Sequence, residues 1–206
     1  MESPISNSTL DAFREHIAAA KDPIAGGVAV ASVSASLGMA LLALTLKVAS
    51  RRKNFLGDRA RLTKLLEAVN KESARLVRYA DQDVAAYQQY RDSLKRKRGI
   101  GAALRRIIQR PLEAAGSAAR GVDICAEAVT VAPLSVVSDL GAAATLLAGS
   151  VRAILLTVDV NLRQLPAGSK LRRNIGKKRQ ALERGATRQV ERVLRKVARL
   201  IQRDGE

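Results

Sequence analysis

The chain has 206 residues, a formal net charge of +17, 47% hydrophobic residues, no Trp and a single cysteine. Its length fits one domain with an extension, and a composition rich in Ala, Leu and Arg but poor in aromatic residues predicts an all-α fold. The single cysteine, Cys125, excludes an internal disulfide and a cysteine metal cluster within one chain. We therefore expect a cytoplasmic protein.

The positive charge is concentrated in two short segments. Residues 91–110 carry a net charge of +7 and residues 166–206 carry +9, whereas residues 1–90 and 111–165 carry +3 and −2. A nearly neutral body thus has a basic insertion and a basic tail. This distribution indicates a polyanionic partner or ligand for these two segments only.

The first predicted helix begins near Ser8, where a hydroxyl residue precedes an acidic first turn, and it ends before Pro23. It contains His16, the only histidine of the chain. A single histidine without a companion is usually a surface or helix-flank residue. We therefore interpret His16 as a residue on the flank of this helix.

The next segment, Pro23 to Lys53, is the most apolar of the chain. It begins with Gly26 and Gly27, and residues 24–46 contain no charged side chain. Two glycines before a helix permit close backbone approach and leave N–H groups free for an anion. An uncharged run of this length is also long enough to cross a bilayer. The residues by themselves permit both a buried bundle helix from Gly26 to Ser50 and a membrane span.

A long amphipathic helix is predicted from Arg59 to Lys95, with apolar residues at three-four spacing. Asp81 and Asp83 lie near the end of its apolar stripe, and Asp83 is four residues from both Tyr79 and Tyr87. This pattern has two interpretations. The acids are either a solvated pair, or one of them has its pKa raised by a pocket.

After a basic linker at residues 95–99, a helix is predicted from Ala102 to Thr130, with Pro111 either kinking it or starting a new segment. Ser138 and Asp139 are predicted to cap a further apolar helix that extends to Leu162. Arg152 and Asp159 interrupt this helix and make it a poor membrane span.

The last predicted helix follows Pro166 and has one apolar side, with Arg and Lys on its other faces. It can cover the bundle with a solvated basic face, pair across a dimer, or lie on an anionic membrane surface. We divide the chain into a helical domain at residues 1–165 and a basic amphipathic helix at residues 166–206.

Several segments between Leu10 and Leu165 match one family in their order and spacing. They are Pro23-Ile24-Ala25-Gly26-Gly27, Ser36-Leu37-Gly38, Asp81-Gln82-Asp83-Val84-Ala85-Ala86-Tyr87, Arg110-Pro111-Leu112, Ser138-Asp139 and Val160-Asn161-Leu162. With them the chain resembles the formiminotetrahydrofolate cyclodeaminase and methenyltetrahydrofolate cyclohydrolase family. Val28 and Ala29 stand where that family has a third glycine and a serine.

This resemblance implies an all-α bundle of about five to six long helices, a homodimer, and a folate site with no metal. A tetrahydrofolate derivative would be the substrate, and Asp83 matches the catalytic aspartate, a general acid/base. The resemblance also favours a buried bundle helix over a membrane span for residues 24–46. The implied substrate-binding residues are Gly26, Gly27, Asp81, Ser138, Asp139 and Asn161, with Arg52 and Lys53 for the glutamate tail.

The resemblance leaves two reactions open, because one acid can serve either. A cyclodeaminase releases ammonia from 5-formiminotetrahydrofolate, and a cyclohydrolase hydrolyses 5,10-methenyltetrahydrofolate. The alternative function is a catalytically silent scaffold of the same fold that binds a polyanion or a protein through residues 91–110 and 166–206. Nucleic-acid binding agrees with the charge, but few aromatic residues are present for base stacking.

Overall fold

The computed structural model describes residues 4–20, 22–53, 55 and 57–203. These residues form six α-helices and two short 3₁₀ helices and contain no strand, which confirms the all-α prediction. The elements are η1 (Ile5–Asn7), α1 (Leu10–Ala18), α2 (Gly27–Arg51), α3 (Arg59–Lys95), α4 (Ile100–Ala128), η2 (Leu134–Val136), α5 (Val137–Leu162) and α6 (Lys170–Arg203).

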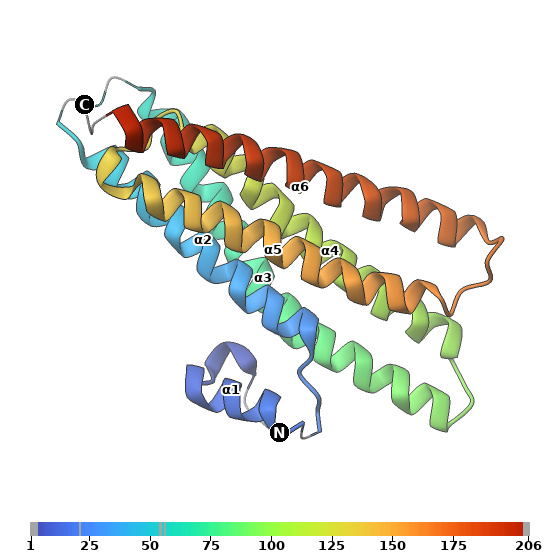
Figure 1. Ribbon diagram of the computed structural model, residues 1–206. Helices are drawn as coiled ribbons and strands as arrows, with labels where there is room; N and C mark the ends of the chain where they lie inside the picture. The colour runs from blue at the N-terminus through green and yellow to red at the C-terminus, as the bar shows by residue number, and fades with distance from the viewer. Residues whose placement is uncertain (1–3, 21, 54, 56, 204–206) are drawn as a thin grey trace.

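Helices α2 to α6 run side by side in alternating directions and form an up-and-down bundle, as short connections between long helices require (Figure 1). Helix α2 packs against α3 and α5, α4 packs between α3 and α5, and α6 covers α4 and α5. The short helix α1 lies outside this bundle. Its Phe13 packs with Ala25, which precedes α2, with Ala29 of α2 and with Ala80 of α3.

Helix α3 has the bounds that its apolar spacing predicts, Arg59 to Lys95. Four side chains at intervals of seven or fourteen residues, Leu62, Val69, Leu76 and Tyr90, are almost completely buried. Such a repeat keeps one seam of the helix against its neighbours. We call the buried side of α3 that this repeat defines the core seam. Asp83 occupies the one remaining position of the repeat, between Leu76 and Tyr90, and therefore lies on the core seam.

Helix α4 continues through Pro111 without a break. A proline inside a helix leaves the carbonyl four residues before it without its usual donor. Here that carbonyl belongs to Ile107, and it accepts a hydrogen bond of 2.8 Å from Nδ2 of Asn161 on α5. Because this side chain satisfies the freed carbonyl, Pro111 neither starts a new segment nor ends the helix.

Helix α5 begins one residue before Ser138, and its N-cap, Val136, makes no side-chain capping hydrogen bond. The prediction that Ser138 and Asp139 cap this helix is therefore wrong. Ser138 is exposed and lies inside the first turn, where Asp139 also lies. An acid in the first turn interacts favourably with the helix dipole without capping the helix.

Helix α6 covers the bundle with the apolar side that the sequence predicts. Ile175, Ala186, Val193 and Val197 are buried and belong to the same core as α2 to α5. At the boundary with α5, the Arg179 guanidinium lies 2.8 Å from the Asp159 carboxylate. Of the three roles considered for this helix, covering the bundle is the one seen in the monomer.

One buried ionic cluster joins α3 to α4. The Glu72 side chain is 7% exposed, and its carboxylate lies 2.6 Å from Arg120 and 2.8 Å from Arg75. Burial acts to raise the pKa of Glu72, but hydrogen bonds from Arg120 and Ser117 and the two nearby positive charges lower it below its usual value. The acid is therefore held in its charged form.

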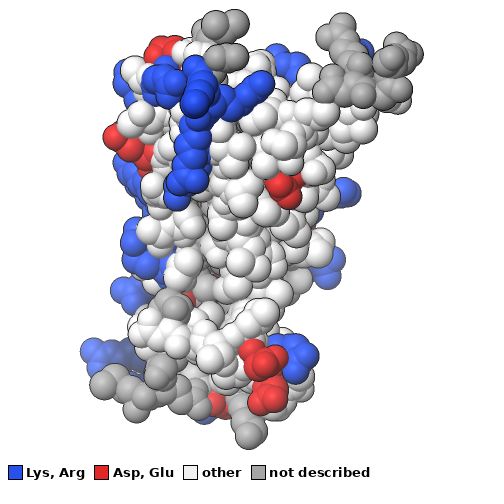
Figure 2. Space-filling model, turned by 90° about the vertical axis from the view of Figure 1, so that its left-hand side faces the viewer, with Lys and Arg blue, Asp and Glu red and all other residues white. Residues whose placement is uncertain are grey.

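The outer side of α2 and α5 is apolar. By length and composition, Gly27–Arg51 and Leu134–Leu162 are long and apolar enough to cross a membrane. In the bundle, 44% of the most apolar 18-residue stretch of the first segment is buried, and 56% of that of the second. We call the exposed remainder the apolar face; its large side chains are Leu37, Leu44, Leu146, Leu156 and Val160. Figure 2 shows a side of the molecule whose middle has few charged side chains, whereas Lys and Arg gather along its edges.

Candidate functional site

Asp81 and Asp83 do not act as a pair, because they point to different sides of α3. Two residues along a helix correspond to a rotation of about 200°. Asp81 points toward the N-terminal segment, where its Oδ1 accepts a hydrogen bond of 2.7 Å from the backbone N–H of Ile5. Asp83 points into the seam. Asp81 and Asp83 are therefore not a solvated pair, and each lies in an environment of its own.

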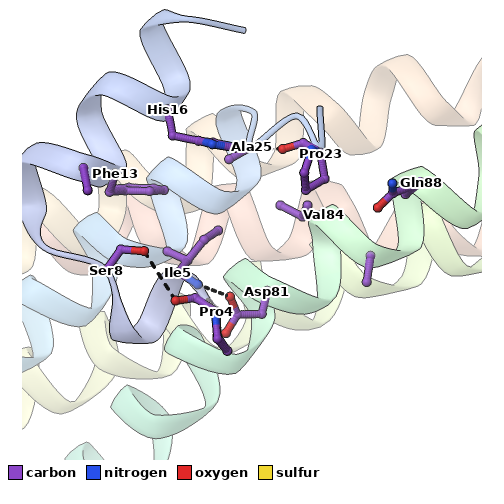
Figure 3. A pocket seen from close by; sticks show the side chains of 12 residues that line it. Pro4, Ile5, Ser8, Phe13, His16, Pro23, Ala25, Asp81, Val84 and Gln88 are labelled. Carbon is purple, nitrogen blue, oxygen red and sulfur yellow. Dashed lines mark hydrogen bonds between the residues drawn. The ribbon is translucent and has the colours of Figure 1, made fainter. Parts of the chain in front are cut away.

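Asp81 lines a pocket of about 430 Å³ between α1, η1 and α3 (Figure 3). The walls combine apolar side chains with a few polar groups, which is the usual composition of a small-molecule site. The other residues around the pocket are Pro4, Ile5, Ser8, Ala12, Phe13, His16, Pro23, Ala25, Val84, Ala85 and Gln88.

His16 lies in the wall of this pocket, which its position on the flank of a short helix did not reveal. Its Nε2 is 2.8 Å from the backbone carbonyl of Pro23. Because a carbonyl only accepts hydrogen bonds, this nitrogen carries the proton, and in a neutral ring Nδ1 is left as an acceptor. The contact connects α1 to the segment that leads into Gly26 and Gly27.

Asp83 lies in an environment that favours its neutral form. Burial raises the pKa of Asp83 to about 6, and no hydrogen bond or ion pair to its carboxylate is found among the described residues. A carboxyl group with this pKa is present in both protonation states near neutral pH, as a general acid/base requires. The structure thus agrees with the interpretation of an acid perturbed by its surroundings.

The beginning of α2 lies close to Asp83. Ala80, one turn before Asp83 on α3, packs against Ala25 and Ala29, which flank Gly26 and Gly27. The N-cap, Gly26, provides no side-chain capping bond, and a Cβ at either glycine would meet nothing within 4 Å. The first N–H groups of α2 thus lack a side-chain cap, and the helix dipole there favours an anion or a carbonyl oxygen.

A second buried polar group, Ser32, lies on the core side of α2. Its side chain is fully buried, and its hydroxyl has no hydrogen-bond partner among the described residues. The contacts of Ala80 with Ala29 place Ser32 and Asp83 within about two helical turns, ~10 Å, along the bundle axis. No sequence signal distinguishes Ser32 from the other small residues of α2, so sequence reasoning missed it.

The other predicted residues do not join this cluster within one chain. Helix α2 is about 37 Å long by its 25 residues, and Arg52 and Lys53 follow its far end. Because α5 runs antiparallel to α2, Ser138 and Asp139 also lie at that far end. Asn161 lies at the near end, where its amide already donates to the carbonyl of Ile107.

The described residues contain no group of three or more His, Cys, Asp or Glu side chains that could hold a metal ion. The candidate site thus consists of Gly26, Gly27, Ser32 and Asp83 on one side of α3. The pocket around Asp81 and His16 lies on the other side.

Comparisons with known proteins identify the family of the chain and a solved structure of the same all-α fold. The family model described as formiminotransferase-cyclodeaminase matches residues 9–181, and the chain belongs to this family. The sequence resemblance is thereby confirmed.

A search of curated protein sequences gives no significant match. Among solved structures, the chain is similar to the crystal structure of formiminotetrahydrofolate cyclodeaminase from Thermotoga maritima, with a TM-score of 0.89 and 19% sequence identity. The match covers 96% of this chain and 99% of that one. At this identity the likeness demonstrates a shared fold.

Proposed function

We propose that the protein is a folate one-carbon enzyme that uses Asp83 as its general acid/base. Its substrate is 5-formiminotetrahydrofolate or 5,10-methenyltetrahydrofolate. The observation that carries this proposal is a carboxyl group at a core seam position, beside the glycine start of α2, for which the described residues provide no hydrogen-bond or ionic partner. A charged group is costly at such a position, and a family of folate enzymes gives it a chemical role.

The carboxyl group suits both reactions. In ring closure of the formimino compound, ammonia leaves, and the protonated acid donates a proton to the departing nitrogen. In hydrolysis of the methenyl compound, the carboxylate attracts the cationic substrate and accepts a proton from the attacking water. The pKa of about 6 provides both states of Asp83 near neutrality.

The surrounding groups are assigned to substrate binding. The N–H groups at Gly26 and Gly27 would meet carbonyl or carboxylate oxygens of the folate. The Ser32 hydroxyl, which has no protein partner among the described residues, would bond to the buried part of the pterin ring. Asp81 faces the pocket on the other side of α3, so it is not assigned to this site.

We also propose that the protein works as a homodimer, paired through the apolar face of α2 and α5. In a pair whose two-fold axis is perpendicular to the helices of this face, the two α2 helices would run in opposite directions. The end that carries Arg52, Lys53, Ser138 and Asp139 in one protomer then approaches the Gly26 end of its partner. This arrangement would reunite the predicted site residues that one chain separates.

The test is turnover of each substrate by purified protein in the cytoplasmic pH range. We expect either ammonia release from 5-formiminotetrahydrofolate or accelerated loss of 5,10-methenyltetrahydrofolate over buffer. Replacing the acid in Asp83→Asn should lower kcat by about 10²-fold or more. The control is Asp81→Asn, which removes a carboxylate two residues away and should retain most of kcat.

Equal rates for the wild type and Asp83→Asn would overturn the role of Asp83. Binding of both folates without turnover by the wild-type protein would indicate a catalytically silent relative instead of an enzyme.

A further inference from the structure

The two basic segments of the sequence meet at one end of the bundle. Helices α3 and α5 run in the same direction, so the α3–α4 turn and the α5–α6 turn lie at the same end (Figure 1). A hydrogen bond between the Tyr90 hydroxyl and Gln164 joins the ends of these two helices. Exposed cations in and beside these turns are Lys95, Arg96, Lys97, Arg98, Arg163 and Lys170.

From this end, a row of cations continues along α6. Its members are separated by three, four or seven residues and therefore lie on one side of the helix. All of them are exposed, whereas the opposite side of α6 is packed into the core. The row consists of Lys170, Arg173, Lys177, Arg184, Arg188, Arg192, Arg195 and Arg199. Together with the cations of the two turns, we call this row the basic edge.

Few acids of the described residues lie beside the row of cations on α6. Asp123 of α4 lines the same hollow as Arg188, Arg192 and Arg195, and its carboxylate accepts a hydrogen bond from Gln189. Among the described residues of α6, Glu191 is the acid nearest to this row, at 4.0 Å from Arg195. The other acid, Glu183, bonds to Arg179 instead. Like charges one turn apart on a helix repel each other and destabilise it. An anionic partner would relieve this repulsion.

We propose that the basic edge binds an extended chain of phosphates, such as the backbone of a nucleic-acid strand, without reading its sequence. Six of the eight cations of the row are Arg, whose planar guanidinium pairs with phosphate in two-point geometry. The described part of α6 contains no Trp, Tyr or Phe for stacking on bases. The phosphates, rather than the bases, would therefore supply the binding energy.

The shape of the basic edge favours a flexible chain over a flat membrane. Helix α6 runs along the length of the bundle, and the α3–α4 turn lies at its end (Figure 1). The row lies on the exposed side of α6, and the other cations lie in the turn. A planar bilayer touches one of these two surfaces at a time, whereas a flexible strand can follow both. Five members of the row, from Arg184 to Arg199, lie beyond residue 181, where the family match ends. The proposal therefore does not rest on the enzymatic one.

The experiment measures anisotropy of a labelled single-stranded oligothymidylate during titration with the full-length protein at several salt concentrations. Each neutralised phosphate contributes a slope of about −0.7 to log K against log salt, so contact by five to seven cations predicts a slope of about −3.5 to −5. Inorganic polyphosphate is added as a competitor. Competition at equal phosphate concentration would show that the phosphate chain alone is sufficient, and failure to compete would contradict the claim that the phosphates supply the binding energy.

The test variant is Arg188→Glu with Arg192→Glu, and the control is Lys64→Glu with Lys71→Glu, which makes the same charge change on exposed positions of α3. We expect the test variant to bind at least about tenfold more weakly, with a salt slope shallower by about 1.4, and the control to lose less than about twofold. Thermal unfolding of both variants verifies that they are folded.

Equal losses in the test variant and the control would overturn the proposal, because net charge alone would then explain binding. Absence of binding by the wild type, or tighter binding to anionic phospholipid vesicles that depends on the same two arginines, would also overturn it.

Discussion

Asp83 occupies a seam position at which the other members of the repeat, Leu62, Val69, Leu76 and Tyr90, are apolar or aromatic. Burial raises the pKa of Asp83 to about 6, so the folded protein binds a proton more tightly there than the unfolded chain does. Stability from this residue is therefore greatest below its unfolded pKa of about 4, and it falls as the pH rises toward 6.

Asp83→Asn removes the charge but keeps the size of the side chain. We expect this variant to be more stable than the wild type by about 1–3 kcal/mol at pH 8, with the difference vanishing below pH 4. Denaturant unfolding of both proteins across this range measures the effect. A difference that does not change with pH would mean that Asp83 is solvated in the folded state.

At the scale of single residues, sequence reasoning identified the groups whose pattern is local. The four-residue spacing of Asp83 to Tyr79 and Tyr87 left its role open, and the family resemblance assigned that role. The glycines were distinguished by their position before a helix. Ser32 was not identified, and the place of His16 in a pocket wall was not foreseen, because both depend on contacts with other segments. The same reason explains why Ser138 and Asp139 were grouped with Asp83 although they lie at the far end of the bundle.

The packing of α4 against α2 and α5 depends on one small residue. A Cβ at Gly121 would lie 2.5 Å from Cε of Met39 and 2.9 Å from Cδ1 of Leu147. Both of these side chains are fully buried, so they have little space to move into. The three helices can approach this closely only because position 121 has no side chain.

Gly121→Ala should destabilise the protein by about 1–2 kcal/mol, because overpacking outweighs the better helix propensity of alanine. Gly176→Ala, in α6, is the control, since a Cβ there meets nothing within 4 Å. That control should be stabilised by about 0.5–1 kcal/mol. Thermal unfolding of the two variants gives the comparison, and equal changes of either sign would contradict the packing argument.

At the scale of elements, the sequence predicted every long helix, and the bounds of α3 in full. The continuity of α4 through Pro111 was left open, because it depends on Asn161, which is 54 residues away from Ile107. The start of α5 was misassigned because Ser and Asp residues are common in first turns as well as at caps.

The whole molecule presents an apolar face that a single chain leaves uncovered. Leu37, Leu156 and Val160 are 55%, 64% and 61% exposed on α2 and α5. Contiguous exposed apolar surface on a soluble protein usually marks an interface. A second copy of the chain is the partner that we propose for it.

Leu37→Glu combined with Leu156→Glu should convert the proposed dimer into a monomer, because the charges would be buried at the interface. Light scattering coupled to gel filtration measures the mass. Leu94→Glu is the control, since Leu94 is 45% exposed but lies at the end of α3, away from the apolar face. A wild type that is monomeric without detergent would refute the pairing.

The sequence thus predicted the two basic segments and the all-α fold. It did not predict that the two basic segments meet at one end of the bundle. That juxtaposition follows from the common direction of α3 and α5. It therefore depends on the topology of the bundle.

The central claim is that Asp83 performs proton transfer on a folate substrate, and the pH dependence of kcat/KM tests it most directly. Because kcat/KM reports ionisation in the free enzyme, the account predicts an inflection near pH 6 in the wild type for whichever of the two folates is turned over. In Asp83→Asn the rate should be much lower and this inflection should be absent, while folate still binds. An unchanged profile in the variant would contradict the account.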